Sequence, residues 1–357
     1  MPHRAPVLRA AIFDLDDTLI PESSPWREAL AVVCGPVEEA HGVPPGLLAQ
    51  AVEAIASARY ETLDAGHGFS ARFGVSWEEC LWGPLADASA RQLPGLNAVA
   101  AALRKSTWPD ALEAVGIRAP GLAVELDRRY ERDRRTRHRP FPTAAGTVAA
   151  LRDRGLLVAC VTNGASEIQR EKLRRSGAEP WFDVALVSGE EGVGKPDPEL
   201  LRLACDRLGV SADEAIYVGN SPTRDIACAE AAGMRSVLVW RDEEPPESSR
   251  LPPPRAVERI VYEVHGLLGY VDGWRVARAF RAVDSARRPV SIDLPESRDG
   301  SFAARVGPEL DPLRPSVAGA SPRRTIEAGL RALRARAGDE PWRHDLGEPV
   351  DWDALLR

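Results

Sequence analysis

Residues able to catalyse the transfer of a group occur at four places in this sequence, three of them after a predicted strand and one ahead of a predicted helix. Two carboxylates, Asp14 and Asp16, stand one residue apart. One could attack as a nucleophile while the other exchanges protons with the leaving group and with water. Each motif alone is typical of a turn or a helix cap. The four places are Asp14-Leu-Asp-Asp-Thr18, Thr162-Asn163-Gly164, Lys195-Pro196 and Gly219-Asn220-Ser-Pro-Thr-Arg-Asp225.

Strands alternate with helices on both sides of these motifs. Residues 8–15 form an apolar run that ends in acidic residues, which predicts a buried strand. Further strands are predicted at 156–162, 183–187, 215–218, 235–240 and 257–261, with helices between them. This alternation predicts a parallel sheet with helices on both faces. Because ligands bind beyond the carboxyl ends of such strands, we expect the four motifs to form one site.

The stretch from Ser24 to His138 is predicted to be helical and to contain no strand. Ser24-Pro25 can start its first helix, and glycine and proline clusters divide the remainder. Its tryptophans, at helical spacing, are expected to lie in a core rather than to bind a substrate. A dense basic run at 128–139 favours a solvated helix face, although one or two of its arginines could meet an anionic substrate.

Composition excludes several classes of protein. The net charge is −7, which argues against broad binding of nucleic-acid phosphates. No apolar run approaches the roughly 18 residues of a membrane span, and residues 1–6 lack a signal-peptide pattern. The five cysteines are scattered without a CxxC pair, so they predict neither a disulfide framework nor a zinc site. A cytoplasmic location is the default expectation.

The signal weakens beyond Tyr270. Helices are plausible at 274–283 and 323–337, with a polar stretch rich in glycine, proline and serine between them. We expect an extension of unknown role at 271–357, partly helical or disordered, which could dock a protein partner.

The four motifs, in this order, resemble those of the haloacid dehalogenase-like superfamily. The resemblance covers roughly residues 8–268 and implies a Rossmann-like α/β core with an α-helical cap domain inserted after the first strand. We therefore expect the core at 1–22 and 139–270 and the cap at 23–138. As a lid, such a cap would exclude water and favour a small phosphorylated metabolite.

The resemblance also implies roles for the motif residues. Asp14 would form an aspartyl-phosphate, and Asp16 would act as general acid and base. Lys195 would counter the charge of Asp14 and of the phosphate. Thr162 and the backbone amides of Asn163 and Gly164 would donate hydrogen bonds to phosphate oxygens.

A divalent cation would offset the repulsion between these carboxylates and a phosphate, and the resemblance implies Mg²⁺. Its expected ligands are Asp14, the backbone carbonyl of Asp16, Asn220 and Asp225. Asn220 departs from the family pattern, which usually has an aspartate there, so we expect weaker magnesium binding. Asp17 is interpreted as a turn residue without a catalytic role.

The predicted activity is magnesium-dependent hydrolysis of a small phosphomonoester. A haloacid dehalogenase is the first alternative, but those enzymes lack the second aspartate of DxDxT, and Asp16 is present. A phosphomutase would return the phosphate to a sugar, a difference that the sequence does not reveal. A catalytically weakened binding or regulatory module is favoured only by Asn220. The retained carboxylates beside Lys195 argue against it, because binding alone does not require them.

Overall fold

The computed structural model describes a defined subset of the 357 residues. The chain divides into two compact units, one holding residues 1–236 and 252–258 and the other holding 237–251 and 259–357. The described residues are 8–85, 93–239, 257–261, 264, 266–271, 277–283, 289–294, 302–308, 316–319, 331–335 and 343–344.

A six-stranded sheet forms the centre of the α/β part of the chain, in the order β3-β2-β1-β4-β5-β6. The central pairs β3-β2, β2-β1 and β1-β4 are parallel, which confirms the predicted parallel sheet. Phe13 pairs with Cys160 on one side and with Val218 on the other. The strands are β1 (Ala10–Phe13), β2 (Leu157–Thr162), β3 (Val184–Val187), β4 (Ala215–Gly219), β5 (Arg235–Val239) and β6 (Val257–Val261).

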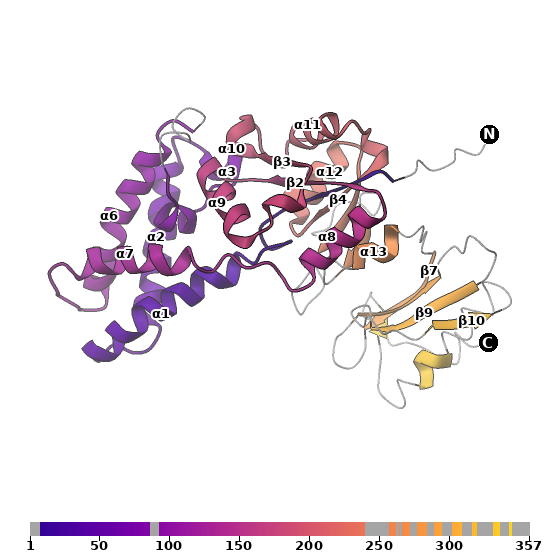
Figure 1. Cartoon of the computed structure of the whole chain (residues 1–357). Coiled ribbons are helices and arrows are strands. Elements are labelled where there is room, and N and C mark those ends of the chain that lie inside the picture. The colour runs from indigo at the N-terminus through magenta and orange to yellow at the C-terminus, as the bar shows by residue number, and fades with distance from the viewer. Residues whose placement is uncertain are drawn as a thin grey trace. The chain divides into compact units, whose positions relative to one another are not determined.

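Helices cover both faces of this sheet, as the alternating pattern predicted. One face packs its apolar side chains against α11 and α12, while α8 lies on the opposite side (Figure 1). All four residues of β1 are fully buried, which explains why the strand reads as a continuous apolar run. The helices between β1 and β5 that follow the insert are α8 (Ala144–Asp153), α9 (Ser166–Ser176), α10 (Ser188–Glu191), α11 (Glu199–Leu208) and α12 (Ala227–Ala231), and α13 (Gly266–Val271) comes after β6 in the chain.

The order of the strands reverses at β1. The chain runs from β1 outward through β2 to β3, and then returns to add β4 on the other side of β1. In open α/β sheets, ligands bind at the carboxyl ends of the strands where the strand order reverses in this way. Asp14 is the first residue after β1.

A helical insert, residues 23–134, lies between β1 and α8. Its described residues contain helices and turns but no strand, as predicted. Trp82 and Trp108 are fully buried in its own hydrophobic core, which confirms that tryptophans here build a core. The helices are α1 (Ser23–His41), α2 (Leu47–Asp64), α3 (Phe69–Phe73), α4 (Trp77–Trp82), α6 (Leu96–Ala114) and α7 (Leu122–Arg134), coloured indigo to magenta in Figure 1.

The extension beyond residue 271 contains a second sheet, which corrects part of our prediction. The strands are antiparallel, in the order β10-β9-β8-β7-β11. The helix predicted at 274–283 is wrong, because Ala277–Val283 is strand β7. A register shift between Arg278 and Phe280 interrupts the alternation of a regular strand, so Arg278 and Arg281 stand at a helix-like spacing of three.

The remaining strands of this sheet are β8 (Pro289–Leu294), β9 (Phe302–Pro308), β10 (Ser316–Gly319) and β11 (Arg343–His344). Residues 331–335 are helical, within the helix predicted at 323–337, whose other residues lie outside the described part of the chain. In the described residues, no helix has the length and apolar character needed to cross a membrane. The predicted domain boundaries stay a prediction.

Glu38 shows how one buried side chain joins two helices of the insert. It lies on α1, and its carboxylate accepts hydrogen bonds from the backbone amides of Gly46, Leu48 and Ala49, at 2.7, 2.8 and 3.3 Å. These amides belong to the first turn of α2, where helix geometry leaves them without intrahelical partners. The negative charge also lies at the positive end of the helix dipole.

We expect Glu38→Ala to lower the free energy of unfolding by about 2 kcal/mol, because it leaves these amides unsatisfied. The neighbouring Glu39 is exposed, so Glu39→Ala should change the same quantity by less than about 0.5 kcal/mol. Urea denaturation measures both variants. Equal effects would contradict a capping role for Glu38.

Candidate active site

Asp14 is buried at the end of β1, with only 5% of its surface exposed. Its two carboxylate oxygens have different partners. Oδ1 accepts a hydrogen bond from the Lys195 ammonium at 2.5 Å, and Oδ2 accepts one from the Thr18 hydroxyl at 3.0 Å. Burial raises the pKa of Asp14 to about 6, against the opposing effect of Lys195. The hydrogen bonds from Lys195 and Thr18 hold the carboxylate in a fixed orientation.

Lys195 lies between two carboxylates. Besides Asp14, its ammonium contacts Asp225 Oδ1 at 2.7 Å and the Tyr217 hydroxyl at 2.9 Å. Although burial acts to lower it, the pKa of Lys195 lies above its usual range because the two carboxylates outweigh burial. The lysine therefore stays charged.

The side chain of Asn163 positions the backbone of Lys195. Its amide nitrogen donates to the Lys195 carbonyl, and its amide oxygen accepts from the Lys195 backbone N–H, both at 2.9 Å. The structure thus brings Asp14, Asn163, Lys195 and Asp225 together, from four separate loops, as the sequence predicted. Asn163 acts here through its side chain, whereas we had assigned a role to its backbone amide.

Asp225 and Asn220 follow β4. Asp225 Oδ2 accepts from the backbone amide of Ser221 at 2.8 Å, so the loop holds this carboxylate from the side away from Lys195. The Asn220 side-chain oxygen lies 3.4 Å from the Thr18 hydroxyl, which also contacts Asp14. Carboxylate and amide oxygens therefore meet around Thr18. This oxygen-rich set suits magnesium, which prefers such ligands.

No group of three or more His, Cys, Asp or Glu side chains suited to a metal is found in the part of the chain that the structure describes. The candidate set has a different composition, because it combines the carboxylates of Asp14 and Asp225 with the amide of Asn220 and a backbone carbonyl. Asn220 stands where the family pattern has an aspartate, so the set carries one negative charge fewer than that pattern.

Asp16 faces a different partner, Lys172 of α9. Its Oδ2 accepts from the Lys172 ammonium at 2.9 Å and from the Gln169 side-chain amide at 3.1 Å. Its Oδ1 is buried and has no hydrogen-bond partner among the described residues. Burial raises the pKa of Asp16, as do the nearby carboxylates of Glu22 and Glu79, against the effect of Lys172. Asp16 therefore keeps a proton more readily than an ordinary aspartate.

The other predicted phosphate ligands already have partners within the protein. Thr162 donates its hydroxyl to the Gln169 side chain at 3.2 Å. The Gly164 amide donates to the Ser188 hydroxyl at 2.9 Å. A phosphate that used these groups would have to replace those bonds. Their role as phosphate ligands stays a prediction.

Asp17 is the turn residue that we expected. Its φ is 55°, in the left-handed region that aspartate tolerates better than most residues. Its carboxylate accepts from the backbone amides of Glu22 and Ser23, at 2.8 and 3.1 Å, and from the Ser23 hydroxyl. These bonds fix the chain where it enters the helical insert.

Sequence reasoning missed four residues of the site. Thr18 belongs to the first motif, yet we assigned it no role. Tyr217 stands in the middle of an apolar strand, where its hydroxyl gave no signal. Gln169 and Lys172 lie three residues apart, so they share one face of α9, the helix that follows Thr162-Asn163-Gly164. The spacing of three between Gln169 and Lys172, on a helix that follows a predicted site motif, was the signal from which they could have been found.

The basic run at 128–139 is not wholly a solvated face. Arg134 is fully buried and pairs with Glu22 at 2.6 Å, while Arg135 forms two hydrogen bonds with Glu171 of α9, at 2.6 and 2.7 Å. Arg137 contacts Glu28 at 2.8 Å. The basic run therefore supplies contacts, from the end of α7 and from the residues just after it, to α9 and to α1.

His138 lies beside this buried cluster. Its ring packs on Trp82 with centroids 5.0 Å apart, and Nδ1 lies 3.5 Å from Arg134 Nη1. Burial lowers the pKa of His138 to about 3, and the positive charges of Arg134 and Lys172 act in the same direction. The folded protein therefore holds this imidazole neutral.

The unfolded chain takes up a proton at His138 below an ordinary pKa of about 6.5, whereas the folded protein does not. His138 thus lowers the free energy of unfolding as the pH falls from 7 to 5. We expect His138→Gln to reduce that loss by about 2 kcal/mol. Urea denaturation of the wild type and the variant at both pH values measures it. An unchanged loss in His138→Gln would mean that His138 is protonated in the folded protein.

The comparisons with known proteins agree with this geometry. A family model for haloacid dehalogenase-like hydrolases matches residues 8–233, well over half of the chain. A phosphoserine phosphatase of Thermus thermophilus is 36% identical over 247 residues, which cover 68% of this chain and 93% of that protein.

Two further relatives match over shorter stretches. A glyceraldehyde 3-phosphate phosphatase of Methanopyrus kandleri is 37% identical over 118 residues, 32% of this chain and 51% of that protein. An (S)-2-haloacid dehalogenase of Burkholderia cepacia is 35% identical over 107 residues, 30% of this chain and 46% of that protein. The fold, the ordered motifs and the extent of the family match lead to one conclusion: the chain belongs to the haloacid dehalogenase-like hydrolase family.

Proposed function

We propose that this protein is a magnesium-dependent phosphatase that hydrolyses a small phosphomonoester through an aspartyl-phosphate on Asp14. The observation that carries the proposal is the pair of aspartates after β1. Asp14 is oriented by Lys195 and Thr18, and Asp16, two residues on, is held by Lys172 and Gln169. These contacts support the proposal that Asp14 attacks the phosphate and that Asp16 transfers the proton.

In the first step, a carboxylate oxygen of Asp14 attacks phosphorus and the bond to the leaving oxygen breaks. Asp16 donates a proton to that oxygen, so an alcohol departs rather than an alkoxide. In the second step, water attacks the aspartyl-phosphate while Asp16 takes up a proton from it. Inorganic phosphate leaves and both aspartates return to their starting states. Two moderate barriers replace one high barrier.

Lys195 assists both steps by electrostatics. Its charge lies 2.5 Å from Asp14 Oδ1, so it offsets part of the repulsion between that carboxylate and an incoming phosphate. Magnesium, held by Asp14, the Asp16 carbonyl, Asn220 and Asp225, would neutralise further negative charge on the phosphate. The convergence of oxygen ligands around Thr18 supports this assignment.

The helical insert is proposed to act as a cap over the site. The loop after α3 lies against the catalytic strand ends, because Ser188 Oγ donates to the Phe73 carbonyl at 3.0 Å. A Cβ atom added at Gly74, where φ is +72°, would lie 2.7 Å from the Asn163 side chain. This close approach supports a small substrate, such as a phosphorylated metabolite, over a protein-bound phosphate.

A haloacid dehalogenase is the second candidate, since one relative carries that name. Those enzymes attack carbon and have no use for a second aspartate, so the placement of Asp16 supports phosphatase chemistry. The long match to a phosphoserine phosphatase supports it too. A phosphomutase, a binding module, a protein partner for the extension and a cytoplasmic location stay untested predictions.

The first test is phosphate release from a panel of small phosphomonoesters, including phosphoserine, phenyl phosphate and p-nitrophenyl phosphate, with and without magnesium. We expect magnesium-dependent release, which Asp14→Asn lowers by more than about 10³-fold because the nucleophile is lost. Asp153→Asn, at an exposed aspartate of α8, should leave the rate unchanged. If folded protein releases phosphate from no member of the panel, the phosphatase proposal is wrong.

Asn220→Asp tests the metal site. The variant restores a negative charge to the oxygen set, so magnesium should bind on the order of tenfold more tightly. The measurement is the rise in the thermal unfolding midpoint with magnesium concentration, which reports binding without activity. Thr223→Asp adds the same charge at an exposed position nearby and should not shift the titration. An unchanged titration in Asn220→Asp would place Asn220 outside the coordination shell.

A further inference from the structure

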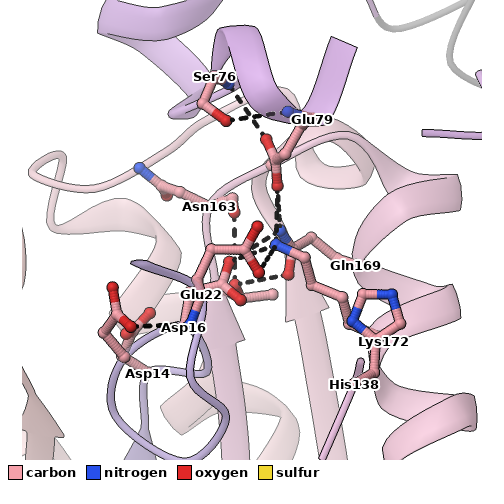
Figure 2. Close-up of polar contacts among 12 residues, drawn as sticks. Asp14, Asp16, Glu22, Ser76, Glu79, His138, Asn163, Gln169 and Lys172 are labelled. Carbon is pink, nitrogen blue, oxygen red and sulfur yellow. Dashed lines mark hydrogen bonds and ion pairs between the residues drawn. The ribbon is translucent and has the colours of Figure 1, made fainter. Parts of the chain in front are cut away.

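Lys172 is a fully buried lysine surrounded by three carboxylates. Its ammonium lies 2.9 Å from Asp16, 2.9 Å from Glu79 and 3.2 Å from Glu22 (Figure 2). The three come from different parts of the chain: Asp16 follows β1, Glu22 stands where the insert begins, and Glu79 lies on α4. Burial would lower the pKa of Lys172, but these carboxylates hold it well above its usual range. The lysine is therefore a permanent cation.

Gln169, one turn earlier on α9, also contacts both Asp16 and Glu79. Its side-chain amide donates to Asp16 Oδ2 at 3.1 Å and to Glu79 Oε1 at 3.0 Å. Lys172 donates to these same two oxygens. Two donors of the core helix thus bridge one oxygen of the active site and one oxygen of the insert. Asp16 Oδ2 accepts both of these donors, whereas the buried Oδ1 has no hydrogen-bond partner among the described residues.

Glu79 is itself firmly placed. Its second oxygen accepts from the Ser76 backbone amide at 3.1 Å, and the Ser76 hydroxyl accepts from the Glu79 amide at 3.3 Å. This capping box fixes the start of α4. The position of the Glu79 carboxylate beside Lys172 therefore depends on the position of α4. If the insert moved away from α9, Lys172 and Gln169 would each lose one acceptor.

We propose that Lys172 is a positioning residue, which holds Asp16 in its working orientation and ties that orientation to the seating of the insert through Glu79. The proposal rests on the proposed function, since it assumes that Asp16 protonates the leaving oxygen. Lys172 touches neither Asp14 nor Lys195 in the described contacts. Its effect on catalysis passes through Asp16.

The plain alternative is that Lys172 only joins the insert to the core. A neighbouring ion pair offers a matched control for that role. Glu171, the preceding residue of α9, accepts two hydrogen bonds from Arg135, the residue that directly follows the last helix of the insert. This pair also joins α9 to the insert, but it does not contact Asp16. Loss of either contact would loosen the insert, whereas only loss of Lys172 would release Asp16.

The experiment compares kcat/KM for phenyl phosphate and p-nitrophenyl phosphate. The two esters have similar shapes, but phenolate needs a proton to leave, whereas nitrophenolate leaves readily without one. Because kcat/KM covers only the steps up to departure of the leaving group, the later attack of water does not enter. Lys172→Met should lower kcat/KM for phenyl phosphate about tenfold more than for p-nitrophenyl phosphate.

Further variants distinguish a role of Lys172 in positioning Asp16 from a role in joining the insert to the core. Glu79→Gln should show the same preference for the better leaving group to a smaller degree, and Lys172→Arg should restore part of the lost rate on phenyl phosphate. Glu171→Gln should change both esters by the same factor. If Lys172→Met does not fold, Glu79→Gln and Lys172→Arg carry the test. An equal loss for both esters in these variants overturns the proposal.

Asp16→Asn distinguishes failure of this proposal from failure of the proposed function. It should show the largest difference between the two esters, because the acid itself is gone. If Asp16→Asn shows no difference, Asp16 is not the general acid, and the proposed function is wrong at that point. If Asp16→Asn shows the difference and the Lys172 and Glu79 variants do not, only the positioning role is wrong.

Discussion

A buried ammonium group must be matched by carboxylates, and two such groups organise this protein. Lys195 requires Asp14 and Asp225, and Lys172 requires Asp16, Glu22 and Glu79. An unpaired buried charge costs several kcal/mol, so removing one partner is far more damaging than losing a surface pair. The two lysines divide the aspartates after β1 between them. They thereby give the carboxylates different surroundings within a span of three residues.

This division is what the proposed two-step displacement would need. A nucleophile must stay ionised beside a positive charge, while an acid must hold its proton until the leaving oxygen requires it. Of the two aspartates after β1, Lys195 contacts only Asp14. Asp16 instead contacts Lys172, which also pairs with two other carboxylates. The end of β1 brings Asp14 and Asp16 close together. Their pairing with different lysines would then allow one to act as the nucleophile and the other as the acid.

Most of the core and the place of Lys195 in the site could be predicted from the sequence, whereas the place of Lys172 could not. Asp14 and Asp225 could be placed together because each follows a strand of a predictable parallel sheet, and Lys195 joined them through the order of the motifs along the chain. Lys172 could not be placed, because its partner Glu79 lies on the helical insert, and no local pattern tells which face of α4 meets which face of α9. Strand β7 was missed for a local reason, since a register shift interrupts the regular alternation by which a strand is recognised.

The shared acceptors also limit how this family's parts can be exchanged. Asp16 Oδ2 and Glu79 Oε1 receive the same two donors, so the insert and the α/β part carry complementary halves of one charge arrangement. An insert transplanted from a relative without a carboxylate at the Glu79 position would leave Lys172 short of a counter-charge. Substrate preference, if it resides in the insert, is then inherited together with the α9 residues. Recombination within such a family is constrained to inserts and cores whose charges match.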